Sequence, residues 1–226
     1  MQVIFETLFD AAYLAVALLF GVLMIIKAKD KKNVLILGIM TLILVFGDSF
    51  HLIPRIIALH TTGTDDYLIS IGAGKLITSV TVTFFYLLLY YIWRKRYNIQ
   101  GKLWLDIIIL VLTISRIVLC IFPQNGWYIA NPGLSWKIYR NIPFVIMGLI
   151  MIVLTYRSAH INNDKTFRFL WLAITLSFAF YIPVVLLAGA YPWVGVFMLP
   201  KTACYIWIIV MFYKTITEDF KIDETE

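Results

Sequence analysis

Residues 34–58 read VLILGIMTLILVFGDSFHLIPRIIA, a run in which only Asp48, His51 and Arg55 can carry a charge. A helix needs about 20 apolar residues to cross the hydrocarbon core of a bilayer. A backbone surrounded by lipid must satisfy its own hydrogen bonds, so such a run predicts an α-helix. The segment therefore predicts a membrane-spanning helix that carries polar side chains inside it.

Six further runs of the same kind surround this segment. The seven predicted spans are roughly 8–26, 34–58, 68–93, 103–122, 136–156, 167–187 and 194–213. Hydrophobic residues make up 62% of the chain and charged residues 14%, with a mean hydropathy of +0.88, whereas a soluble domain needs more polar surface. We expect an all-α, polytopic bundle of seven transmembrane helices over 1–214, followed by a short acidic cytoplasmic tail over 215–226, soluble and poorly ordered.

The basic residues outside the spans predict the orientation of the bundle. Thirteen of the nineteen Lys and Arg fall in the loops after the first, third and fifth spans or in the tail, and the loops around 61–67, 123–135 and 189–193 carry none. The positive-inside rule then places the N-terminus outside and the C-terminus in the cytoplasm. The net charge of +6 comes from these basic loops and does not indicate a nucleic-acid partner. We expect a multi-pass protein of the cell membrane.

Tryptophans near the loops are typical of residues at a membrane–water interface. Trp127, Trp136 and Trp193 suit an outer aromatic belt, because an amphipathic ring is favoured at the level of the lipid head groups.

Six basic residues remain within the predicted spans or at their edges. They are Arg55, Lys75, Arg116, Lys137, Arg140 and Lys201, and they are accompanied by the acids Glu6, Asp10 and Asp48 and by His51. A charged group in the hydrocarbon costs about 2.5–3.5 kcal/mol on insertion scales and therefore indicates a functional site. Counted by helix rise, these groups all fall in the outer half of the membrane, which favours one polar cavity that opens outward.

The cations outnumber the acids, so the expected guest of this cavity is anionic, a phosphate or carboxylate on a membrane lipid or a small molecule. The predicted ligand-binding residues are Arg55, Lys75, Arg116, Arg140, Lys201 and Tyr205. Spacing supports them, because Asp48, His51 and Arg55 share one helix face and Lys75 shares another with residues 78–79. No metal site and no cofactor is expected.

Each of these charges also has a structural alternative. Arg55, Arg140 and Lys137 could extend to the outer surface, and the lysines of the third and seventh spans could pair with acids to lock helices together. His51 could hydrogen-bond to a neighbouring helix, and Asp10 could lie at the interface. A structural network would tend to balance its charges, and this set is rich in cations.

Residues 35–86 carry a resemblance to a known family. Gly47 and Asp48 end a helix rich in small residues, and Ile71, Gly72 and the hydroxyl-bearing residues 78–79 follow in the next span. This pattern resembles the YhhN family of membrane proteins, which includes the lysoplasmalogenases. The chain departs from that family at 174–187, where the family usually has a second acidic residue and this sequence has none.

The resemblance implies hydrolysis of the vinyl-ether bond of a lysoplasmalogen. Asp48 would then be the catalytic acid and base, with His51 or Glu6 as its partner, and the cations would hold the lipid phosphate. Three other functions remain open. They are a transporter or sensor for a small anion, a retinal protein with Lys201 as the Schiff base and Asp48 as its counter-ion, and a structural subunit of a larger complex.

Overall fold

The structure is a computed structural model that describes residues 2–29, 31–130 and 132–223, with side chains described for 3–29, 31–130 and 132–216. The described part forms seven α-helices and two short 3-10 helices, η1 and η2. They are α1 (Gln2–Ala28), α2 (Lys32–His60), α3 (Leu68–Arg96), α4 (Leu103–Ile121), η1 (Pro123–Asn125), α5 (Leu134–Ile161), α6 (Leu170–Leu187), η2 (Pro192–Phe197) and α7 (Met198–Asp223). All seven α-helices are long and apolar enough to cross a membrane, which confirms the predicted all-α bundle of seven helices of spanning length.

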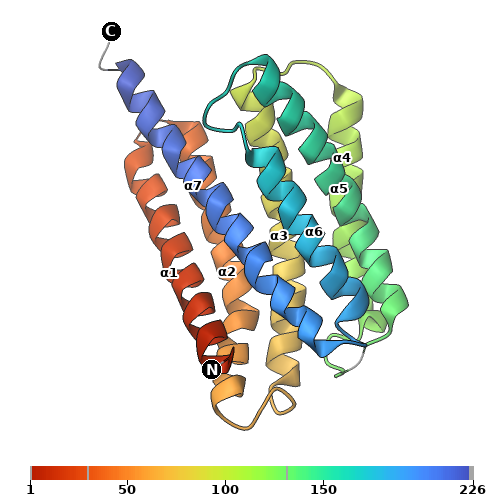
Figure 1. Ribbon diagram of the computed structural model, residues 1–226. Coiled ribbons are helices and arrows are strands. Elements are labelled where there is room, and N and C mark those ends of the chain that lie inside the picture. Colours follow the sequence, from red (N-terminus) through yellow and green to blue (C-terminus); the bar gives the residue numbers. More distant parts are fainter. Residues whose placement is uncertain (1, 30, 131, 224–226) are drawn as a thin grey trace.

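The helices form an up-and-down bundle in which each packs against the next in sequence (Figure 1). Contacts between α1 and α7 close the bundle, and α3 also contacts α5. The connections after α1, α3 and α5 lie at the end where the chain terminates. The N-terminus and the connections after α2, α4 and α6, which include η1 and η2, lie at the opposite end.

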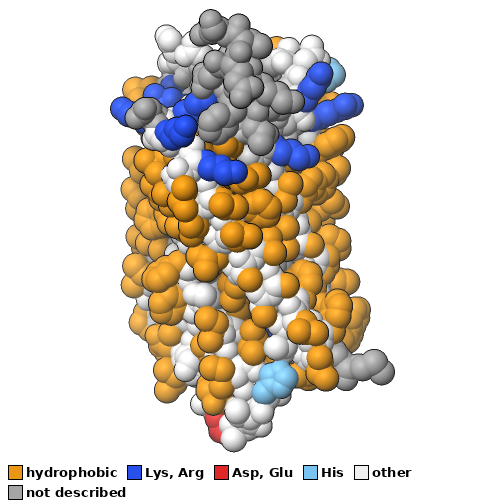
Figure 2. All heavy atoms as spheres, turned by 90° about the vertical axis from the view of Figure 1, so that its left-hand side faces the viewer, with side chains coloured by type: hydrophobic (Ala, Val, Ile, Leu, Met, Phe, Trp, Pro, Cys, Tyr) orange, Lys and Arg blue, Asp and Glu red, His pale blue; other side chains and the backbone are white. Residues whose placement is uncertain are grey.

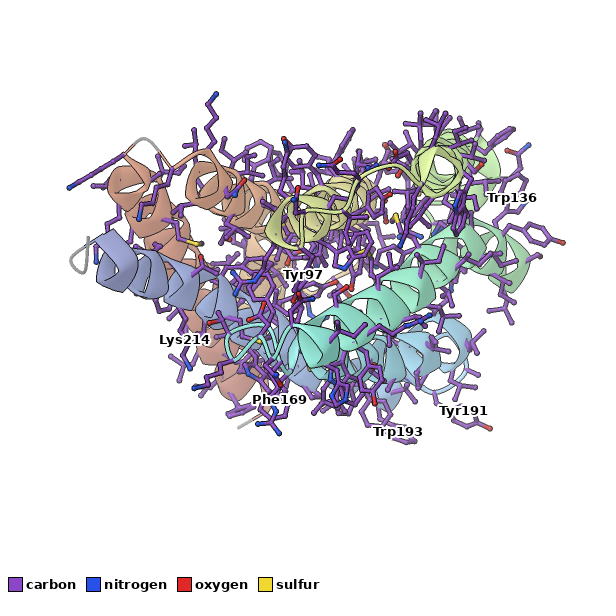
Figure 3. The ribbon with its side chains drawn as sticks, turned by 90° about the horizontal axis from the view of Figure 1, so that it is seen from above. Tyr97, Trp136, Phe169, Tyr191, Trp193 and Lys214 are labelled. Carbon is purple, nitrogen blue, oxygen red and sulfur yellow. The ribbon has the colours of Figure 1, made fainter. Side chains whose placement is uncertain are left out.

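The surface of the bundle matches a chain that lies in lipid. Large apolar side chains such as Leu18, Leu19, Ile107 and Val153 are exposed on its sides. Figure 2 shows a broad hydrophobic band on one face, and the Lys and Arg side chains of that face gather above the band, at the end where the chain terminates. Seen from above, Trp136, Tyr191 and Trp193 lie at the periphery of the bundle (Figure 3).

Helix α7 continues past the last predicted span residue and through Asp223, so the first part of the predicted acidic tail is helical. The last three residues of that tail, 224–226, lie outside the described residues.

Helices α2 and α3 approach closely because small residues face each other across their contact. Gly47 faces the side chain of Thr81, and Gly74 faces the backbone of Phe50 and His51. A Cβ atom at Gly74 would meet those backbone atoms at less than van der Waals distance. Such close packing is a common way for membrane helices to associate, and here it brings His51 of α2 against α3.

The substitution Gly74→Val tests this contact. We expect it to lower stability by about 1–3 kcal/mol, because the added side chain meets backbone that cannot move away without separating α2 and α3. The measurement is the thermal midpoint of the purified protein in detergent. Gly133→Ala is the matched control, because a Cβ at Gly133 meets no neighbouring atom. Equal midpoints for the two variants would contradict the close contact.

At the other end of the bundle, a carboxylate joins α3 to the connection after α5. Asp164 accepts hydrogen bonds from Arg96 Nη2 at 2.8 Å, from the Tyr97 hydroxyl at 2.9 Å and from the backbone N–H of Phe167 at 3.0 Å. Burial raises the pKa of Asp164, but these hydrogen bonds and the Arg96 charge outweigh it and hold the pKa below its ordinary value.

Because its pKa is lowered on folding, Asp164 stabilises the fold above its unfolded pKa and loses this effect as the pH falls through its folded pKa. We expect Asp164→Asn to lower stability by about 1–3 kcal/mol at neutral pH. The gap between the two proteins should close as the pH is lowered below about 4, as measured by thermal midpoints from pH 3 to 8. A gap that stays constant with pH would show that the carboxylate charge contributes nothing.

Candidate functional site

A cavity of about 330 Å³ lies among α2 to α7, toward the end of the bundle that holds the N-terminus. All six basic residues singled out in the spans line it. They are Arg55 of α2, Lys75 of α3, Arg116 of α4, Lys137 and Arg140 of α5, and Lys201 of α7. Val82, Phe144 and Phe178 add an apolar part to the lining. Within the described residues, no acidic side chain lines this cavity.

Arg116 is the most deeply placed of these cations, with 1% of the residue exposed. Its Nε donates to the Thr83 hydroxyl at 3.0 Å, and its Nη1 donates to the Arg140 carbonyl at 2.7 Å and to Asn141 Oδ1 at 2.8 Å. The guanidinium also lies 4.1 Å from the centre of the Phe144 ring. All these partners are uncharged, so Arg116 is held in a fixed orientation while its charge is left uncompensated.

Arg140 is held by the connection between α4 and α5. Its Nη1 donates to Asn125 Oδ1 at 2.9 Å, and its guanidinium lies 3.9 Å from the centre of the Trp127 ring. Asn125 is fully buried, and its amide N–H groups donate to three carbonyls at the end of α4, those of Leu119, Cys120 and Phe122. One loop asparagine therefore both ends α4 and positions a cavity arginine.

Among the lysines of the cavity, Lys201 has aromatic neighbours. Its ammonium group lies 5.5 Å and 5.1 Å from the ring centres of Tyr181 and Tyr205. Among the six cations, Arg55 is the one that forms an ion pair with a described carboxylate, with 3.0 Å between its Nη2 and Glu6 Oε2. No such ion pair joins Lys75 or Lys201 to a described acid, although Lys201 lines a smaller pocket together with Glu6 and Asp48.

The acids lie together in a smaller pocket of about 30 Å³ between α1, α2 and α7. Glu6, Asp10 and Asp48 line it and are 8%, 7% and 6% exposed, so all three are buried within the bundle. The Tyr13 hydroxyl donates to Asp48 Oδ2 at 2.6 Å. The expectation of one cavity for acids and cations is wrong for Asp48, because α2 turns its carboxyl toward α1 and away from the larger cavity.

His51, Arg55 and Lys201 line both spaces and form the boundary between them. His51 Nδ1 lies 2.9 Å from the Thr78 hydroxyl, and that hydroxyl donates to the Gly47 carbonyl at 2.8 Å. The alternative in which His51 hydrogen-bonds a neighbouring helix is therefore correct for Nδ1.

All six predicted binding residues come together, and others join them. The larger cavity is lined by Arg55, Lys75, Arg116, Arg140, Lys201 and Tyr205 together with His51, Lys137 and Trp127. The aromatic-belt position of Trp127 stays a prediction. Tyr13, Asn125 and Asn141 were missed. For Asn125, the sequence offers only its place two residues after Pro123, which does not indicate a contact with Arg140.

No group of three His, Cys, Asp or Glu is placed to hold a metal ion within the described residues, and Cys120 and Cys204 are buried and free. The site therefore offers oriented cationic donors, one imidazole and a separate set of carboxyls as its chemistry.

Comparisons with models of protein families, with curated proteins and with solved structures find no match to this chain.

Proposed function

We propose that this chain is an integral membrane protein that binds the phosphate group of an anionic amphiphile in the cation-lined cavity. The observation that carries the proposal is the absence of a carboxylate partner for five of the six cavity cations, within the described residues. Arg116 is buried, and the six cations share one cavity that no described carboxylate lines, so their mutual repulsion is costly and a bound anion removes that cost. The bundle would lie with its N-terminus outside and its C-terminus in the cytoplasm, in agreement with the distribution of basic loops.

The shape of the lining supports an amphiphile rather than a simple ion. The cations share the cavity with Phe144, Phe178, Val184, Val185 and Met198, a larger apolar surface than an inorganic anion would need. Small-molecule sites typically span about 300–1,000 Å³, so this cavity holds a head group and a few carbons but not a whole lipid tail. The rest of the tail would extend between helices into the bilayer.

A transporter or sensor of a small anion would use the same cations. It would differ from the proposed function in its ligand, which would be a small anion rather than an amphiphile. The retinal alternative would place a protonated Schiff base at Lys201 among five further cations of the same cavity. Positive charges that line the same cavity oppose protonation of a Schiff base, so the lining favours an anionic ligand over retinal.

Phosphate binding is tested by thermal shift on the full chain in an uncharged detergent. We expect phosphate and a lysophospholipid to raise the midpoint, and chloride at equal ionic strength to leave it unchanged. Lys75→Gln and Lys201→Gln should weaken phosphate affinity about tenfold each, because each removes a charged donor. Lys102→Gln, in the α3–α4 connection, is the matched control and should bind as the wild type does.

The same variants separate a binding role from a structural one. Removing a cation from an unoccupied cavity relieves repulsion between like charges, so the ligand-free Lys75→Gln protein should be at least as stable as the wild type. If both cavity variants are instead less stable and still bind phosphate normally, the cations have a structural role and the proposal is wrong. An absence of any phosphate effect on the wild type would also overturn it.

A second candidate, hydrolysis of a vinyl-ether lysolipid, is favoured by His51, which lines both the cavity and the pocket of Asp48. A phosphate held by the cations would leave the adjoining ether bond near this boundary. The carboxyl of Asp48 would donate its proton to the outer vinyl carbon, and water would add to the carbon bonded to oxygen while returning a proton to the Asp48 carboxylate. The resulting hemiacetal would break into an aldehyde and a glycerophospho head group with a free hydroxyl.

Aldehyde release from a lysoplasmalogen measures this activity directly. We expect Asp48→Asn to reduce the rate by at least about 100-fold while phosphate binding persists, since Asp48 lies outside the larger cavity. Asp66→Asn, an exposed acid in the α2–α3 connection, is the control and should retain full activity. Wild-type protein that binds the lysolipid but releases no aldehyde would reject hydrolysis and leave the binding function intact.

A further inference from the structure

The hydrogen bonds of His51 determine which of its ring nitrogens carries a proton. The Thr78 hydroxyl has one hydrogen, and that hydrogen is directed to the Gly47 carbonyl, which can only accept. With its hydrogen on that carbonyl, the Thr78 oxygen accepts from His51 at the 2.9 Å contact, and on this basis we assign the ring hydrogen to Nδ1. In the neutral ring this leaves Nε2 with an unshared electron pair.

The surroundings of His51 keep its ring neutral and leave Nε2 available. Arg55, Lys75 and Lys201 line the same cavity, so a protonated imidazole would add a fourth positive charge beside them. Among the described residues, Nε2 of His51 forms no hydrogen bond. It is also not one of the fully buried polar atoms that lack a partner, so it remains accessible. The ring lines the cavity, where Nε2 meets whatever occupies that space.

Nε2 differs from the lysine and arginine groups of the lining, which can only donate hydrogen bonds. The hydroxyls of Ser79 and Tyr181 donate to the Lys75 carbonyl and to Asn141 Oδ1, so toward an occupant they too accept. Nε2 of this tautomer carries no hydrogen and can only accept. The cavity thus combines many donors, which suit anionic oxygens, with a few acceptors, and Nε2 requires an O–H or N–H on the ligand.

We propose that His51 Nε2 makes the site selective for a phosphate ligand that carries a hydroxyl group. This inference rests on the anion-binding function proposed above. The anionic oxygens accept hydrogen bonds from the arginines and lysines, while the ligand hydroxyl donates to Nε2. An oxyanion without a hydroxyl places its own electron pairs against that of Nε2, and the buried polar groups left unpaired disfavour its binding.

Two ligand sources share this chemistry. Inorganic phosphate at pH 7 to 8 retains a P–OH group, and a lysophospholipid carries a free glycerol hydroxyl beside its phosphate. Sulfate has the same tetrahedral shape and a charge of −2, but it has no proton at this pH. A lysophospholipid whose glycerol hydroxyl is methylated likewise keeps its charge and tail and loses the donor.

The experiment measures the affinity of the full chain in an uncharged detergent for all four probes, by titration calorimetry or thermal shift at pH 8. We expect the wild type to bind phosphate at least about tenfold more tightly than sulfate, a difference of about 1.4 kcal/mol. If the natural ligand is a lipid, the hydroxyl-bearing lysophospholipid should exceed its methylated form by a similar factor. If the natural ligand is free phosphate, both lysophospholipids should bind more weakly than phosphate.

Two variants assign the selectivity to His51. His51→Leu should abolish the preference for phosphate over sulfate while sulfate binding persists, which also shows that the variant is folded. Thr78→Val keeps the imidazole but removes the group that fixes its tautomer, so Nε2 can carry the hydrogen and donate. This variant should bind sulfate more tightly than the wild type does, a gain that a folding defect would not produce.

The outcomes separate this inference from the function on which it rests. If wild-type phosphate and sulfate affinities are equal, or if the preference survives in both variants, the role of His51 is overturned while anion binding stands. If none of the four probes binds and the cavity variants match the surface control Lys102→Gln, the anion-binding function itself fails.

Discussion

Compensation of charge in a poorly solvated interior is the constraint that governs this molecule. Cations in such surroundings need carboxylates, oriented dipoles or bound anions around them. The bundle supplies carboxylates to some of its charged groups, as in the pairs Arg96–Asp164 and Arg55–Glu6. For Arg116 and Arg140 the described residues supply a hydroxyl, carbonyl and amide oxygens and the faces of aromatic rings, all uncharged. These partners fix the direction of each arginine without cancelling its charge.

The separation of acids from cations follows from how α2 is placed. Its neighbours α1 and α7 face Asp48 on one side, where Tyr13 donates to the carboxylate, and the close contact at Gly47 and Gly74 sets its other side against α3. One turn of α2 therefore lies between the cation-lined cavity and the smaller pocket that holds the acids. His51, three residues after Asp48, forms part of the boundary, and both its geometry and its hydrogen bonds depend on that placement.

The seven helices could be predicted because apolar runs of spanning length leave few alternatives in lipid, and the cation cavity was expected because charges on five helices fall in the same half of the spans. Depth does not determine rotation, however. Asp48 and His51 share a stripe in the sequence, yet Asp48 lines only the smaller pocket, whereas His51 lines both. The role of Asn125 could not be read from its neighbours, because it depends on where α5 brings Arg140. The position of Lys137 at a span edge likewise does not show that the cavity reaches it.

The lining of this cavity also has a consequence for how much of the protein persists in a cell. An interior with cations and no lining carboxylate is least favourable when it is empty, so any anion that fills it adds its binding free energy to that of folding. Membrane proteases degrade the less stable population faster, and a difference of about 1–2 kcal/mol can change abundance several-fold. Under the proposed function, the supply of the anionic guest would then set the lifetime of the chain, and unoccupied copies would be the first to be cleared.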